Sequence, residues 1–169
     1  MPEKQTDRLS FLWNVHSYTH EYIRFADAKA CVVIAWAGAL LGFLISADAH
    51  KGLLTLPCNW QVFLLRFAAV LAFACLAASF VLAVIVVLPR VQKGTSKGFV
   101  FWKSIVAHGS MDHFRDAVRH LSESDLESEI CNHLSIVASV ADRKYWLITW
   151  SIGIGLLGSI AAAIVLLLR

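Results

Sequence analysis

Charged residues are scarce in this 169-residue chain: they make up 16% of it, against 58% hydrophobic residues. Soluble globular proteins carry about a quarter charged residues, so this chain lacks the polar surface to cover itself in water. Its length fits one domain, because domains usually have about 100–200 residues. The composition therefore argues against an ordinary soluble protein and indicates an integral membrane protein.

Cysteine motifs and catalytic signatures are missing as well. The four cysteines are widely scattered and form no CxxC pair, which argues against a zinc site or a disulfide framework. The chain has no GxGxxG, no Walker loop, no nucleophile elbow and no kinase signature. Its first 27 residues are polar and charged, so no secretory signal is expected. Nothing here argues for catalysis, and we expect a protein that is not an enzyme and needs no cofactor.

Long apolar runs are what the chain does have. A helix needs about 20 residues to cross a hydrocarbon core of about 30 Å, and three runs are near or above that length. They cover residues 30–47, 62–88 and 145–168. Any one of them fits a buried helix of a soluble protein, but three in so short a chain predict three transmembrane helices.

Lysine and arginine predict the orientation of these helices. They concentrate in residues 1–29 and in the 89–144 connection, whereas the 48–61 loop has only Lys51 and the far end only Arg169. The positive-inside rule then places the N-terminus and the 89–144 connection in the cytoplasm. The 48–61 loop and the C-terminus face outward.

The polar segments also have helical patterns. No glycine or proline interrupts residues 7–37, so the N-terminal helix is expected to continue into the first span. Ser110 is a candidate cap for a short helix, and Ser122 with Asp125 resembles a capping box that opens a second long helix of about 45 residues, running into the third span. The aromatic cluster at 99–103 fits either the lipid headgroups or a helical bundle. The predicted fold is all-α, with a small cytoplasmic helical bundle continuous with the spans.

The first and third spans begin with the same short pattern. Ala-Asp-x-Lys stands at Asp27 and Lys29 and again at Asp142 and Lys144, each time with a glycine nine residues after the lysine. A parallel repeat and the common occurrence of charges at span ends both explain it. Each pattern also ends a polar stripe at helical spacing, which predicts that the two stripes line one cavity. The stripes consist of His16, His20, Arg24 and Asp27, and of Asn132, Ser135, Ser139 and Asp142.

His16 and His20 have the HxxxH spacing that can place two imidazoles on one metal ion. The sequence offers no compelling third ligand, so we expect packing histidines and no metal site. Arg115 and Arg119 are four residues apart, so they share a helix face and can grip a phosphate together.

Small residues recur in all three spans. Small-xxx-small pairs allow helix backbones to approach closely in lipid, so we expect a homo-oligomer. Buried polar residues are nearly absent from the spans, which argues against a water-filled pore. The pairs are Gly38 with Gly42, Ala74 with Ala78, and Ser151 with Gly155.

Several segments together resemble one protein family. They are Arg24 to Ala30, the Leu88-Pro89-Arg90 exit of the second span, the aromatic segment from Phe99 to His108, and Ile130 to Tyr145. With them the chain resembles the Pycsar effector transmembrane family of bacterial antiphage defence. The resemblance implies a membrane effector that responds to cyclic UMP or cyclic CMP, made by a cyclase during infection. The effector then impairs the inner membrane, and the infected cell stops growing.

A nucleotide ligand would need cations for its phosphate and carboxylates for its base or ribose. No nucleic-acid polymer is expected as a partner. The candidate residues are Arg24, Asp27, Lys29, Arg115, Arg119, Asp142 and Lys144. The same residues also fit interhelical ion pairs at the membrane surface. An alternative function is a membrane scaffold that binds a protein partner through its cytoplasmic helices and senses no nucleotide.

Overall fold

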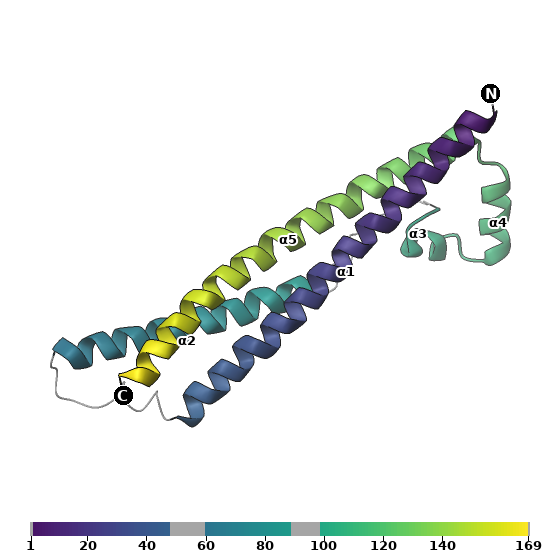
Figure 1. Ribbon diagram of the computed structural model, residues 1–169. Helices are drawn as coiled ribbons and strands as arrows, with labels where there is room; N and C mark the ends of the chain where they lie inside the picture. Colours follow the sequence, from purple (N-terminus) through teal and green to yellow (C-terminus); the bar gives the residue numbers. More distant parts are fainter. Residues whose placement is uncertain (1, 48–59, 89–98, 169) are drawn as a thin grey trace. The chain divides into compact units, whose positions relative to one another are not determined.

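The computed structural model describes residues 2–47, 60–88 and 99–168. These residues form helices α1 (Pro2–Ser46), α2 (Trp60–Val87), α3 (Trp102–Val106), α4 (Met111–Arg119) and α5 (Glu123–Leu167), and no strand occurs among them (Figure 1). The all-α prediction is therefore confirmed. Most of the predicted 48–61 loop, and residues 89–98 of the connection, lie outside the described residues.

The chain divides into two compact units. The first, here called the head unit, comprises Met1–Arg24 and Pro89–Asp142, and the second, the span unit, comprises Phe25–Leu88 and Arg143–Arg169. Both α1 and α5 contribute residues to both units, since each is a single helix of 45 residues. The prediction of two long helices that continue into spans is thus confirmed.

The starts of α4 and α5 follow from their capping residues. Ser110 Oγ accepts a hydrogen bond from the His113 backbone N–H at 3.2 Å. At α5, Ser122 Oγ accepts from the Asp125 N–H at 3.2 Å, while Asp125 Oδ2 accepts from the Ser122 N–H at 3.1 Å. Each bond satisfies a backbone N–H that has no partner within its own helix. The predicted capping box is present, with Asp in place of the usual Glu.

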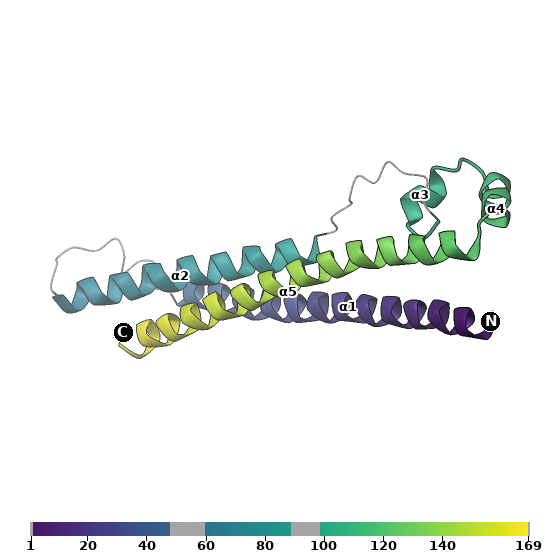
Figure 2. The same cartoon turned by 90° about the horizontal axis from the view of Figure 1, so that it is seen from above.

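The span unit is a three-helix bundle of α1, α2 and α5, which lie side by side in it (Figures 1 and 2). One cluster joins Leu44 of α1, Leu76 of α2 and Val165 of α5. The other joins Ala30 of α1 to Ala83 of α2 and, on α5, to residues near its middle such as Leu147 and Ile148. In this unit α1 and α5 therefore run parallel, and α2 runs antiparallel to both.

Close packing in the bundle depends on two glycines of α5. A methyl group on Gly155 would lie 2.6 Å from Ser79 Oγ, and one on Gly158 would lie 3.0 Å from the Leu76 backbone N. Ser79 and Ser151 are buried beside this contact, and each hydroxyl donates to the other residue's carbonyl oxygen at 2.7 Å. The predicted close approach at Ser151 and Gly155 is confirmed.

The outer surface of the span unit is apolar. Large hydrophobic side chains from all three helices are more than half exposed, which a protein surface in water rarely tolerates over a wide area. Exposed tryptophans mark both ends of the apolar band, as in the aromatic belts of membrane proteins: Trp146 at one end and Trp60 at the other. Helices α1, α2 and α5 are each long and apolar enough to cross a membrane. This surface is suited to lipid.

Candidate functional site

The first Ala-Asp-x-Lys pattern meets the lysine that ends the second pattern in the span unit. Lys144 Nζ of α5 donates to the Asp27 carboxylate of α1, and the two side chains are 17% and 35% exposed. Lys29 Nζ lies 5.4 Å from the centre of the Tyr145 ring, within the range of a cation–π contact. The sequence pattern thus corresponds to a paired contact between parallel helices, with the carboxylate of the first pattern bound to the lysine of the second.

Two other candidate residues lie on the short helix α4 of the head unit. Arg115 Nη1 is 3.6 Å from Asp112 Oδ1, and Arg119 Nη1 is 3.7 Å from Asp116 Oδ1. All four side chains are more than 60% exposed, so water screens both ion pairs and they contribute little to stability. The two guanidinium groups therefore remain accessible to a phosphate that offers better hydrogen bonds.

Arg24 and Asp142, the remaining candidates, are exposed residues of the head unit. The structure shows no ion pair for either of them with another described residue. Four of the seven candidates thus belong to the head unit and three to the span unit. The contacts described join Asp27 to Lys144, and they join each α4 arginine to an aspartate of its own helix.

The aromatic segment after the second span packs inside the head unit. Phe99 lies 5.4 Å from His108 and 6.1 Å from Phe114, measured between ring centres. The Phe99 backbone N–H donates to Glu129 Oε1 of α5 at 2.9 Å. Of the two placements that the sequence left open, these contacts support the helical bundle.

A shallow hollow of about 290 Å³ also lies on the head unit. It is lined by Asp7, Arg8, Phe11 and Leu12 of α1 and by Glu127 of α5, and it includes none of the seven candidates. One cation, two carboxylates and an aromatic ring face this hollow. The excess of negative charge disfavours a phosphate there.

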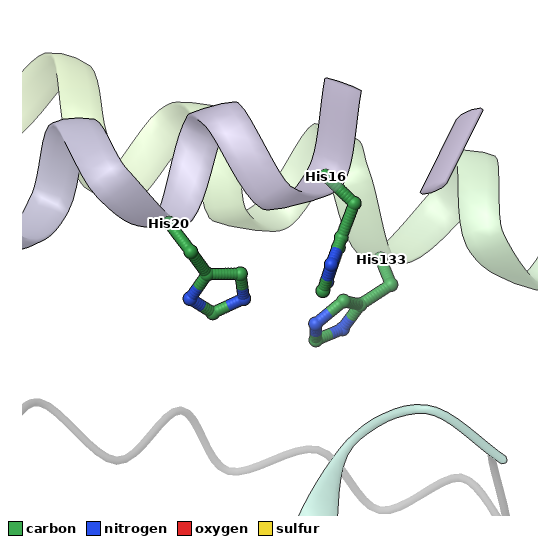
Figure 3. Close-up of side chains that lie close together, drawn as sticks. All are labelled: His16, His20 and His133. Carbon is green, nitrogen blue, oxygen red and sulfur yellow. The ribbon is translucent and has the colours of Figure 1, made fainter. Parts of the chain in front are cut away.

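The predicted meeting of two polar stripes is wrong for α5. Asn132, Ser135, Ser139 and Asp142 are all exposed. His133, the residue after Asn132, contacts α1 instead, with its ring centre 5.2 Å from that of His16 (Figure 3). A helix turns by about 100° per residue, so a shift of one position moves a side chain to another face.

His133 is the residue that reading the sequence missed. A register signal was nevertheless present. His16 stands eleven residues before Asp27, and His133 stands eleven before Lys144. Eleven residues are about three helical turns, so His16 shares a helix face with Asp27, and His133 shares one with Lys144. His16 and His133 thus stand at equal distances in sequence from the two residues of the ion pair.

These features define a class: a membrane protein with three apolar helices and a helical head unit. Comparison with known proteins identifies the family. A family model described as the Pycsar effector protein domain matches residues 11–169. A Staphylococcus aureus protein described as Pycsar effector protein SaPycTM is 31% identical over 132 residues, which are 78% of this chain and 77% of that protein. No solved structure matches the chain. The chain belongs to the Pycsar effector family, whose members are transmembrane effectors, and the resemblance seen in the sequence is confirmed.

Proposed function

We propose that this protein is an antiphage effector that responds to cyclic UMP or cyclic CMP, impairs the inner membrane and so causes abortive infection. The observation that carries the proposal is the family match, which runs through both the head unit and the span unit. The proposal includes no catalytic step. It requires only that ligand binding has different free energies in two arrangements of the helices.

The head unit is the proposed sensor. The excess of lysine and arginine in residues 1–29 and 89–144 supports a cytoplasmic position for it, with the N-terminus on the same side. A nucleotide made in the cytoplasm would then reach the head without crossing the membrane. The apolar surface of the span unit supports its role as the part that acts on the bilayer.

Within the head unit we assign the phosphate to Arg115 and Arg119. A cyclic mononucleotide carries one negative charge on its phosphodiester, and two guanidinium groups on one helix face can bind it with charge-assisted hydrogen bonds. Their present partners, Asp112 and Asp116, are exposed, so replacing these ion pairs with contacts to a phosphate loses little stability. Arg24 and Asp142 remain candidates for the ribose or base, and Asp27, Lys29 and Lys144 for transmission of the signal.

Assembly into homo-oligomers is the proposed route to membrane damage. Ala35, Ala39 and Gly42 lie at helical spacing on α1 and are exposed, so they form a narrow outer face that a second copy can approach closely. Ala74 and Ala78 are exposed on α2 in the same way. The buried small residues of α5 pack within one chain and are not available for this contact.

Titration calorimetry of the purified full-length protein in detergent tests the sensor. Cyclic UMP or cyclic CMP is expected to bind with a stoichiometry of one nucleotide per chain, or of one nucleotide shared by a few chains of an oligomer. Cyclic AMP serves as the matched nucleotide control. The Arg115→Gln/Arg119→Gln variant is expected to lose at least about tenfold in affinity, because it removes two charge-assisted contacts. Arg8→Gln, which alters the hollow on α1, is expected to bind as the wild type does.

Two results would overturn parts of this proposal. Loss of binding in Arg8→Gln but not in the α4 variant would move the ligand to the hollow. No binding of either pyrimidine nucleotide by a protein that is still toxic when overproduced would refute direct sensing and support the scaffold alternative.

A further inference from the structure

Three histidines converge in the head unit. His16 and His20 lie one turn apart on α1, with ring centres 4.5 Å apart, and His133 reaches them from α5. One ligand atom from each of the three imidazoles lies within 4.8 Å of the others. Figure 3 shows the three side chains leaving their helices on the same side, so that the rings gather at one place.

The buried part of this cluster has an unsatisfied polar atom. His16 Nε2 is buried and has no hydrogen-bond partner among the described residues. An imidazole nitrogen buried in this way costs free energy, because it has lost water without gaining another partner. The packing role expected from the sequence does not explain this atom, since the neighbouring Trp13 ring, 5.5 Å away between ring centres, offers only an aromatic contact.

The protonation states also suit a metal ligand. Burial lowers the pKa of His16, and the nearby His20 and His133 lower it further. Burial likewise lowers the pKa of His133, with a further decrease from His20 and a smaller opposing effect of Glu129. Both shifts favour the neutral imidazole, which is the form that binds metals.

We propose that His16, His20 and His133 bind one divalent transition-metal ion, with zinc as the best-suited metal, and that this ion links α1 to α5 in the head unit. Tetrahedral zinc with Zn–N distances of about 2.05 Å holds its nitrogens about 3.3 Å apart, so the rings need to approach by at most about 1.5 Å. His20 is exposed and can turn to do so. Three nitrogen ligands without a carboxylate favour zinc, copper or nickel over magnesium or calcium.

Such a site leaves the fourth zinc position to water, because zinc with three protein ligands usually binds a solvent molecule. The ion would satisfy the buried nitrogen of His16 and fix the register of two helices that otherwise meet there through ring contacts. This role goes beyond the proposed nucleotide response and does not depend on it. The HxxxH pair alone gave no reason to expect it, because the third ligand is 113 positions further along the chain than His20 (133 − 20).

Cobalt(II) is the probe that tests the site directly. The full-length protein, purified in detergent with a tag that contains no histidine and treated with a chelator, is titrated with Co²⁺ and followed by visible absorption. The expected result is one Co²⁺ per chain with the intense d–d bands of tetrahedral coordination, displaced by one equivalent of Zn²⁺. Only weak octahedral absorption, or binding that does not saturate at one equivalent, would overturn the proposal.

Variants separate ligation from nonspecific binding. His133→Ala is expected to lower the cobalt affinity about 100-fold, because it removes one of three protein ligands. His113→Ala, which changes an exposed histidine of α4, is the matched control and is expected to bind as the wild type does. Wild-type affinity in His133→Ala would overturn the assignment.

A third variant guards against loss of fold. His133→Cys is expected to keep binding cobalt and to add a thiolate-to-cobalt charge-transfer band, which only a directly ligating residue produces. Circular dichroism checks that each variant keeps its helix content. A His133→Cys protein with wild-type helicity and no charge-transfer band would also refute the site.

Discussion

Replacement of Gly155 by alanine is expected to destabilise the span unit, although alanine is the better helix former. The added Cβ would lie 2.6 Å from Ser79 Oγ and 2.8 Å from Trp36 Cζ3. Ser79 cannot turn away without breaking its 2.7 Å hydrogen bond to the Ser151 carbonyl oxygen. The indole of Trp36 packs against the bundle core, so it is also held in place.

The expected change in the free energy of unfolding is the sum of three contributions, of which two destabilise the bundle and one stabilises it. Overpacking of a tight contact costs about 1–3 kcal/mol. Weakening of the two Ser79–Ser151 bonds adds about 0.6 kcal/mol for each, the average for such bonds in membranes. The better helix propensity of alanine returns about 0.5–1 kcal/mol. The net expected loss is about 1–4 kcal/mol.

Gly153 supplies the matched control, two residues earlier on the same helix. A Cβ there would meet no atom within 4 Å, so Gly153→Ala is expected to be neutral or slightly stabilising. Both variants can be unfolded in mixed micelles with increasing fractions of SDS, followed by circular dichroism. Equal SDS midpoints for Gly155→Ala and Gly153→Ala would refute the packing described for α2 and α5.

Three further predictions concern other contacts. Asp27→Asn is expected to lower the free energy of unfolding by about 1–2 kcal/mol, less than the loss for a fully buried ion pair, because the carboxylate is partly exposed. Adding Lys144→Met should recover part of that free energy in a double-mutant cycle measured by SDS unfolding. Additive effects of the two substitutions would contradict a coupling between the residues. Hydrogen bonds from Ser122 lower the pKa of Asp125, so this cap stabilises α5 above pH 4 and is lost as pH falls through the lowered pKa. The protection factors of the amides at the start of α5, which correct for the intrinsic pH dependence of exchange, should fall over this pH range in wild type but not in Asp125→Ala. Ala39→Leu, which adds bulk to the outer face of α1 proposed for assembly, should weaken chemical crosslinking between copies. Ala163→Leu, at an exposed position of α5 outside that face, should leave it unchanged.

The apolar spans and the helix caps could be predicted from the sequence because both depend on local physics. The length of residues 62–88 suffices to predict a membrane helix, and α2 occupies almost that range. Ser122 and Asp125 bond each other across one turn, so their spacing alone indicates the cap. These features need no knowledge of a packing partner.

The packing faces could not be predicted in the same way. Gly42 and Gly155 belong to equally plausible small-residue pairs, yet a methyl group on Gly42 would meet nothing within 4 Å, whereas one on Gly155 would clash. Lipid tails and apolar helices attract the same side chains, so hydropathy does not separate outer from inner faces in a membrane. The polar stripe of α5 could not be placed for a related reason: exposure of Asn132 and contact of His133 depend on the position of α1, whose His16 stands 117 positions earlier in the sequence than His133.

The proposed function requires that a pyrimidine nucleotide acts on the bilayer through this protein. Its most direct test uses liposomes that contain the full-length protein, carry a potassium diffusion potential and report it with a voltage-sensitive dye. Cyclic UMP or cyclic CMP is expected to collapse the potential within the time of the assay, and cyclic AMP is expected to leave it intact. A potential that persists with both pyrimidine nucleotides, although the protein in the vesicles is correctly oriented, would refute the proposed function.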